Sequence, residues 1–195
     1  MTASAYALTD QAFDAHRAFR GLLEAMSRPG KIISVGGQVS FPTVLQPSTA
    51  AIALSLFDHD TEIWMGDGIA GIEVYDFLKF NCGCPMTKSS LTADFAIICA
   101  ESDLPSVTQF KQGSDAFPDR SATLIVQAPD LVTGPPITLT GPGIEHESVL
   151  TVAGIADYFW QERREQNSVF PRGVDIVFTS GDRVVALPRS TRLGD

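Results

Sequence analysis

The amino-acid sequence predicts one α/β domain with helices on both faces of a mixed β-sheet, that is, a three-layer α/β/α sandwich. Helix-like and strand-like segments alternate in the first half of the chain. In the second half, strand-like segments follow one another through short turns. An alternating order is typical of parallel strands, whereas short turns join antiparallel ones. With no internal repeat and no long linker, residues 1–195 are expected to form a single domain.

The first half of the chain contains two helix-like and two strand-like segments before residue 66. Apolar residues recur every three or four positions over 10–27, which predicts an amphipathic helix that ends at a proline-glycine turn. A short strand is expected over 31–35. The nearly continuous apolar segment 49–57 predicts a buried helix with Ser48 as its N-cap. The strand 61–65 follows it.

Residues 71–166 are expected to contain three helices and three strands. A helix is expected over 71–81, and the unbroken run of branched residues in 94–99 predicts a buried strand. The expected elements that come next are a short helix over 104–113, two strands at 121–128 and 136–141, and a last helix over 152–166. Proline and glycine turns separate the two strands.

The closing stretch FPRGVDIVFTSGDRVVALPRSTR predicts a β-hairpin followed by a basic tail. Apolar residues alternate from Val174 to Phe178, and Gly181 lies in the turn that leads to the returning strand 183–187. Pro188 ends the pairing, because proline has no amide hydrogen to donate. The hairpin therefore accounts for the apolar residues but leaves the basic tail unexplained.

The tail contains the main candidate binding residues, Arg189, Ser190, Thr191 and Arg192, and Arg172 just before the hairpin is a further candidate. Guanidinium groups bind phosphate or carboxylate through paired hydrogen bonds, and hydroxyl groups complete such a site. Two interpretations stay open. The tail binds a phosphate or a partner subunit, or it is a solvated tail after an edge strand.

The turn LTGPGI offers Gly141 and Gly143 as loop candidates. It is either a tight reversal of the backbone or a loop whose amide groups face an anion. His146 stands where the dinucleotide-binding fingerprint requires its third glycine. The sequence also lacks P-loop, α/β-hydrolase and zincin motifs. No catalytic residue can be assigned, since no nucleophile, base and orienting group stand at a recognisable spacing.

The composition excludes several classes of protein. With 44% hydrophobic and 19% charged residues it is that of an ordinary globular protein. A net charge of −9 disfavours nucleic-acid binding, which requires clustered Lys and Arg. No apolar run approaches the roughly 20 residues that cross a bilayer, and the N-terminus does not resemble a secretory signal. Cys82 and Cys84 have no second pair with which to hold a metal. We expect a cytoplasmic protein without a metal, nucleic-acid or membrane partner.

Three segments, FRGLLEAMSRPGKI (19–32), LTGPGI (139–144) and the closing stretch 170–192, together resemble the PhnH family. Its members are the H subunits of the bacterial carbon–phosphorus (C–P) lyase system. The chain departs from the family pattern at Ser190, where threonine is expected, but the hydroxyl group is kept. The resemblance implies a fold similar to the large domain of pyridoxal-phosphate-dependent transferases, without bound pyridoxal phosphate.

The resemblance further implies an accessory subunit of a transferase complex in organic phosphonate catabolism. That complex joins a phosphonate to the ribose of MgATP, releases adenine and forms a ribose 1-phosphonate 5-triphosphate. The implied partners are the G, I, J and L subunits, and the isolated chain should have little or no activity. Two alternatives remain: a free-standing enzyme that binds a phosphorylated metabolite through Arg, Ser and Thr, and a self-associating scaffold, most simply a homodimer.

Overall fold

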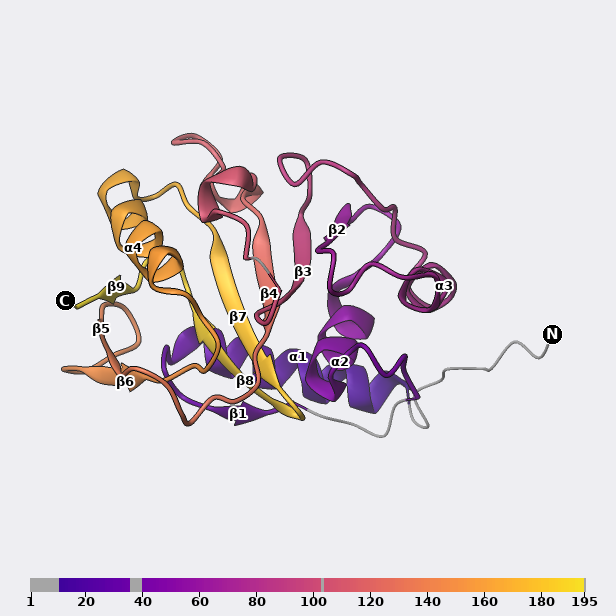
Figure 1. The fold of residues 1–195 in the computed structure, drawn as a ribbon, viewed down its shortest axis with the longest axis horizontal. Coiled ribbons are helices and arrows are strands. Elements are labelled where there is room, and N and C mark those ends of the chain that lie inside the picture. Colours follow the sequence, from indigo (N-terminus) through magenta and orange to yellow (C-terminus); the bar gives the residue numbers. More distant parts are fainter. Residues whose placement is uncertain (1–10, 36–39, 103, 195) are drawn as a thin grey trace.

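The computed structural model of the protein describes residues 11–35, 40–102 and 104–194. These residues form four helices and nine strands (Figure 1). The helices are α1 (Gln11–Ser27), α2 (Pro47–Leu56), α3 (Ile72–Asn81) and α4 (Asp157–Gln166). The strands are β1 (Ile33–Ser34), β2 (Ile63–Met65), β3 (Phe95–Cys99), β4 (Thr123–Gln127), β5 (Ile137–Thr140), β6 (Ser148–Leu150), β7 (Asp175–Ser180), β8 (Arg183–Leu187) and β9 (Arg192–Leu193).

Six of the strands form one mixed sheet in the order β1-β8-β7-β4-β3-β2. The neighbours β2, β3, β4 and β7 are parallel, whereas β8 is antiparallel to both β7 and β1. The parallel strands are joined by long connections that carry α3, short 3-10 turns and α4. The antiparallel pair β7–β8 comes from the closing stretch. The predicted mixed sheet is therefore confirmed.

The six-stranded sheet has a hydrophobic core on each of its faces. On one face, α1, α2 and α3 cover buried strand residues such as Ile97 and Ile125. On the other face, α4 and the small sheet formed by β5, β6 and β9 cover residues such as Ile98 and Val126. Consecutive residues of a strand point to opposite faces, so strands covered on both sides need apolar residues at every position. This confirms the prediction of helices on both faces.

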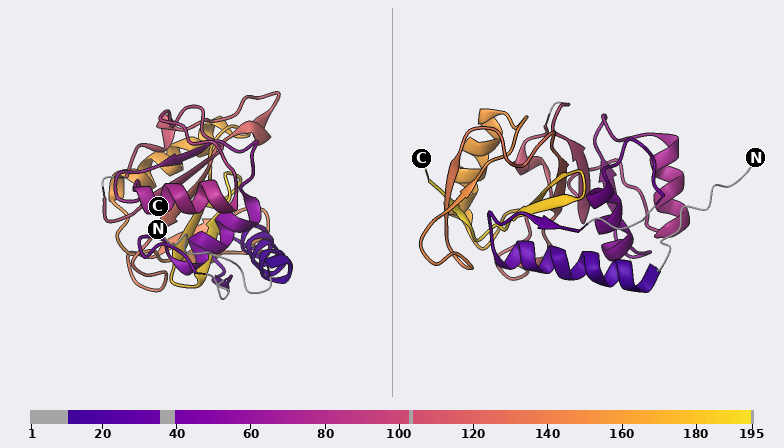
Figure 2. Two further views of the ribbon diagram at one scale, coloured as in Figure 1. Left: turned by 90° about the vertical axis from the view of Figure 1, so that its right-hand side faces the viewer. Right: turned by 90° about the horizontal axis from the view of Figure 1, so that it is seen from below.

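The elements are spread along the longest axis of the molecule (Figure 1). The small sheet and α4 lie at one end, and α3 lies near the other. Figure 2 shows α1 running along the same side of the molecule as β1. Of the apolar positions that predicted the amphipathic helix, Leu22 is buried and Met26 packs against the core, but Phe19 and Leu23 are 40% and 50% exposed. Ala25, which was not among these positions, is also buried.

The small sheet contains two strands that the sequence did not predict. It has the order β6-β5-β9, and both pairings are antiparallel. Part of the predicted basic tail is therefore β9, in which Arg192 lies opposite Thr140 of β5. A strand of two residues shows no recognisable periodicity, so only its pairing partner reveals it.

The prediction of a helix over 104–113 is wrong. All residues of this segment are described, and its helical part is a single turn of 3-10 helix, Val107–Gln109. The side-chain amide of Gln112 donates hydrogen bonds to the carbonyl groups of Val107 and Phe110, at 2.7 and 2.8 Å. These bonds satisfy carbonyl groups in an irregular backbone, so the apolar spacing of the segment does not require a helix.

Two other helices begin at positions that differ from those predicted. α4 begins at Asp157, later than expected, because Gly154 adopts a left-handed φ of +78°. α2 has Gln46 as its N-cap. The predicted N-cap Ser48 lies inside the helix, where its hydroxyl group donates a 2.8 Å hydrogen bond to the carbonyl of Gly181. Within 11–35, 40–102 and 104–194, no helix has the length and apolarity of a membrane span.

Candidate functional site

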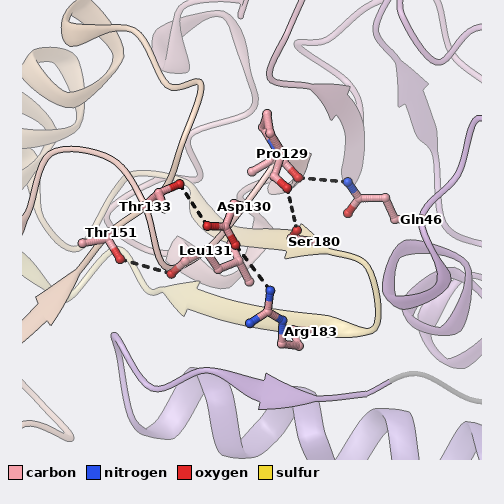
Figure 3. A network of polar contacts seen from close by, with 9 residues as sticks. Gln46, Pro129, Asp130, Leu131, Thr133, Thr151, Ser180 and Arg183 are labelled. Atoms are coloured by element: carbon pink, nitrogen blue, oxygen red, sulfur yellow. Dashed lines mark hydrogen bonds and ion pairs between the residues drawn. The ribbon is translucent and has the colours of Figure 1, made fainter.

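Arg183, at the start of β8, belongs to a polar network that fixes the loop after β4 (Figure 3). Its guanidinium group forms an ion pair with Asp130 at 3.3 Å. The hydroxyl group of Thr133 donates to the same carboxylate at 2.9 Å, and this bond is the main cause of the lowered pKa of Asp130. The hydroxyl group of Ser180 donates to the carbonyl of Pro129 at 3.0 Å. These side chains hold the hairpin against the loop and have a structural role.

The candidate Arg189 is also engaged within the chain. Its Nη2 lies 3.2 Å from Asp175 Oδ2, and its backbone amide donates to Asp175 Oδ1 at 2.7 Å. Its Nη1 donates to Ser121 Oγ at 2.6 Å and to the carbonyl of Pro118. Arg189 therefore fastens the residues after β8 to β7 and to the turn before β4.

The candidate Arg172 lies at a different place. Its Nε is 3.2 Å from Asp115 Oδ1 in an exposed ion pair. It lines a cavity of about 240 Å³ to which Glu162 and Glu165 also contribute. The two carboxylates disfavour an anionic ligand there, and the structure does not bring Arg172 together with the other candidates.

A buried arginine that was not among the predicted candidates holds the C-terminal segment, which we define as residues 188–194. Arg163 of α4 is fully buried. Its Nη2 donates to the carbonyls of Pro188 and Thr191, at 2.7 and 3.1 Å. Asn167 donates to the same Thr191 carbonyl at 3.0 Å. Burial lowers the pKa of Arg163 to about 10, while the nearby Asp175 acts in the opposite direction. Arg163 is thus positively charged at neutral pH.

The sequence contains a pattern that indicates the burial of Arg163. It follows the buried residues Phe159 and Trp160 at helical spacings of four and three, and so lies on the same face of α4. An arginine on an apolar helix face must find hydrogen-bond acceptors inside the protein. The acceptors, however, are backbone carbonyls more than 20 residues away in the chain, which no local pattern reveals.

The two candidate glycines allow close packing of the backbone. A Cβ atom at Gly141 would lie 3.1 Å from the carbonyl oxygen of Ser190, and one at Gly143 only 2.1 Å from that of Ser27. Their φ angles are +129° and +84°. The turn after β5 therefore packs against both the end of α1 and the C-terminal segment. The three segments on which the resemblance rests are neighbours in space.

A cavity of about 620 Å³ lies where the turn after β5, the end of α4 and the C-terminal segment meet. We call it the C-terminal cavity. Its lining residues are Thr140, Gly141, Pro142, Asn167, Phe170, Ser190 and Arg192. It brings together Gly141, Ser190 and Arg192 of the predicted candidates. Arg189, Arg172 and Gly143 do not line it, and Thr191 is fully buried beside it.

The cysteines form no metal centre in the described part of the chain, where no group of three or more His, Cys, Asp or Glu side chains is suitably placed. Cys82 and Cys84 follow α3 as free thiols, and Cys84 is buried. The interaction of the two neighbouring thiols lowers the pKa of Cys84 and raises that of Cys82, and each thiol also donates to a backbone carbonyl, that of Ala53 for Cys82 and that of Leu78 for Cys84.

Comparison with known proteins gives a consistent result. The family model described as bacterial phosphonate metabolism protein (PhnH) matches residues 6–194. The alpha-D-ribose 1-methylphosphonate 5-triphosphate synthase subunit PhnH of Rhizobium meliloti (strain 1021) is 33% identical over 187 residues, which cover 96% of this chain and 94% of the relative. The putative C-P lyase subunit protein HtxG of Stutzerimonas stutzeri is 30% identical over 176 residues, or 90% and 84% of the two chains. The resemblance found in three short segments is confirmed, and the chain belongs to the PhnH family of bacterial phosphonate metabolism proteins.

Proposed function

We propose that this chain is an accessory subunit of a C–P lyase complex in organic phosphonate catabolism. The observation that carries the proposal is the similarity, over 96% of this chain, to a relative named as a subunit of ribose 1-methylphosphonate 5-triphosphate synthase. A second relative is named as a putative C-P lyase subunit. Both similarities extend over most of each relative, so they concern the whole fold rather than one motif.

In the proposed reaction, the complex joins a phosphonate to the ribose of MgATP and displaces adenine, which leaves a ribose 1-phosphonate 5-triphosphate. We assign this chain a supporting role rather than the displacement itself. No set of catalytic residues was recognised in the sequence, and two arginines of this region have structural contacts: Arg189 pairs with Asp175, and Arg163 donates to backbone carbonyls. If this chain binds a ligand, the C-terminal cavity is where we place it.

The proposed partners are the G, I, J and L subunits. Exposed apolar side chains support a chain that contacts other proteins, because such side chains lose contact with water when an interface forms. Phe19 and Leu23 lie one helical turn apart on α1, and Ile72 and Phe80 of α3 are each 72% exposed. These residues are not required for the two cores of the chain.

The function is tested by reconstitution with purified G, I, J and L subunits, MgATP and methylphosphonate, with or without this chain. Release of adenine is followed by chromatography. We expect adenine release to depend on the presence of this chain and to be absent when it is incubated alone. Release at an enzymatic rate by the isolated chain, or an equal rate without it, would contradict the proposal.

A further inference from the structure

Three hydrogen-bond donors of the C-terminal cavity have no partner within the residues that the structure describes. They are the guanidinium group of Arg192 and the hydroxyl groups of Ser190 and Thr140. Asn167, which also lines the cavity, is already used, because it donates to the Thr191 carbonyl at 3.0 Å. The three remaining donors are available to a ligand in a concave site.

The fold holds these donors close to one another. Arg192 and Thr140 are directly opposite in the antiparallel pairing of β5 with β9. Side chains at such positions point to the same face of the sheet and lie close together. Gly141 has no side chain, which lets the backbone of Ser190 approach the turn after β5. The donors therefore belong to an anchored backbone and not to a free tail.

Charge favours an anion in this cavity. None of its seven lining residues is acidic, although the chain has 23 acidic and 14 basic residues. Glu145 and Glu147 lie farther along the connection between β5 and β6, where both are exposed and outside the lining. The absence of a lining carboxylate leaves the charge of Arg192 uncompensated inside the cavity.

The buried Arg163 adds positive charge next to the cavity. Its guanidinium group contacts backbone carbonyls and Asn167, and it forms no ion pair with a carboxylate in the described ranges. Burial weakens the screening of its charge by water. Two buried polar atoms here, Arg163 Nε and Thr191 Oγ1, also have no hydrogen-bond partner among the described residues. Buried polar atoms are normally paired, so their number here is unusual.

We propose that the C-terminal cavity binds a phosphorus oxyanion, either a phosphate or a phosphonate group, through Arg192, Ser190 and Thr140. Guanidinium forks form paired hydrogen bonds with such groups, and hydroxyl groups add further donors. Phe170, which is 58% exposed, and Pro142 supply an apolar wall for the organic part of the ligand. A volume of about 620 Å³ is within the range of small-molecule sites. All of these residues belong to one chain, so binding does not depend on assembly of the complex.

The experiment is isothermal titration calorimetry on the purified full chain with inorganic phosphate, methylphosphonate and MgATP, each to about 10 mM. We expect at least one of the three to bind, and Arg192→Ala to weaken that binding by about tenfold or more. Arg192→Lys should weaken it as well, because lysine keeps the charge but loses the fork. The matched control is Arg183→Ala, which makes the same change in net charge but removes an arginine paired with Asp130 (Figure 3).

The ligand that binds most tightly shows which kind of compound carries the oxyanion. Preference for methylphosphonate assigns the site to a phosphonate, and preference for MgATP assigns it to a phosphate ester. If MgATP is preferred, Phe170→Ala should weaken the binding of MgATP without affecting the binding of inorganic phosphate. Absence of binding by the folded wild-type chain to all three would overturn the proposal. Equal weakening by Arg183→Ala and Arg192→Ala would also overturn it. Failure here leaves the reconstitution result unchanged, so the two proposals are tested separately.

Discussion

The β7–β8 hairpin and the C-terminal segment are adjacent in the sequence but use their polar side chains differently. In the hairpin, Arg183 pairs with Asp130. In the C-terminal segment, Arg189 is paired in a similar way, whereas Arg192 and Ser190 line a cavity without a partner among the described residues. The difference separates arginines that explain the fold from one that is available to a ligand. Proximity in sequence alone did not make this distinction.

The two regions are also held in place differently. The hairpin is fixed by its pairing within the central sheet, where Val177 lies opposite Ala186. The C-terminal segment is fixed by residues of other elements: Arg163 of α4 donates to its carbonyls, and Asp175 of β7 pairs with Arg189 of the segment. Anchoring by other elements lets a short segment present its donors in a fixed arrangement, which lowers the entropic cost of binding. Removing an anchor should therefore affect this segment much more than the hairpin.

The largest effect is expected from Arg163→Met. It leaves the carbonyls of Pro188 and Thr191 without this donor, and we expect the free energy of unfolding to fall by about 3 kcal/mol in urea denaturation. The control is Arg164→Met in the same helix, which removes one bond to the carbonyl of Gly194 and should cost less than half as much. Equal losses in the two variants would show that Arg163 is not a main anchor.

Arg163 should also make the free energy of unfolding depend on pH, and the direction of this dependence can be derived. The pKa of Arg163 is about 10 in the folded chain, well below the ordinary value of an arginine, because burial disfavours the charged form. Between these values the unfolded chain binds more protons, so this residue makes the free energy of unfolding rise with pH. We expect the stability difference between wild type and Arg163→Met to grow above about pH 10. A difference that shrinks as the pH rises would contradict this assignment.

A smaller effect is expected when a methyl group is added at the turn beside the C-terminal segment. Gly141→Ala places a Cβ at 3.1 Å from the Ser190 carbonyl oxygen on a backbone with φ of +129°. Strain and crowding should lower the free energy of unfolding by about 2 to 3 kcal/mol. Gly181→Ala in the hairpin turn also has positive φ, but its Cβ meets no atom of the described residues within 4 Å, and it should cost about 1 kcal/mol. A larger loss in Gly181→Ala would reverse the comparison.

Arg189 and Arg192 should differ in thermal and chemical denaturation. Arg189→Ala removes the ion pair with Asp175 and the bond to Ser121, and should cost about 1 to 2 kcal/mol. Arg192→Ala removes a side chain without a described partner, so it should change the free energy of unfolding by less than about 0.5 kcal/mol. Destabilisation by Arg192→Ala that matches Arg189→Ala would mean that Arg192 has a structural role.

Local patterns predicted the parts of the fold that depend on local chemistry. The apolar run of 94–99 identified β3, and the alternation around Ile176 identified the hairpin. Strands β6 and β9 were missed because they are short and depend on distant partners. The helix over 104–113 was predicted wrongly, since the side chain of Gln112 supports an irregular backbone.

The candidate site was predicted only in part for the same reason. Arg189 and Arg192 were treated as one group, because they lie close together in the sequence with the hydroxyl residues Ser190 and Thr191 between them. The contacts that distinguish them come from Asp175 in β7 and from Thr140 in β5, far away in the sequence. Arg163 was missed because its acceptors are backbone carbonyls of the C-terminal segment.

The claim that this chain works as a C–P lyase subunit is tested most directly by its assembly with the proposed partners. The measurement is size-exclusion chromatography with light scattering after co-expression with the G, I, J and L subunits. We expect the wild-type chain to co-elute in a fixed ratio with them. Arg192→Ala should co-elute as well, because its cavity is assigned to a ligand. Elution of the wild-type chain apart from these subunits, at its own mass of 20.9 kDa or as a homodimer, would contradict the claim.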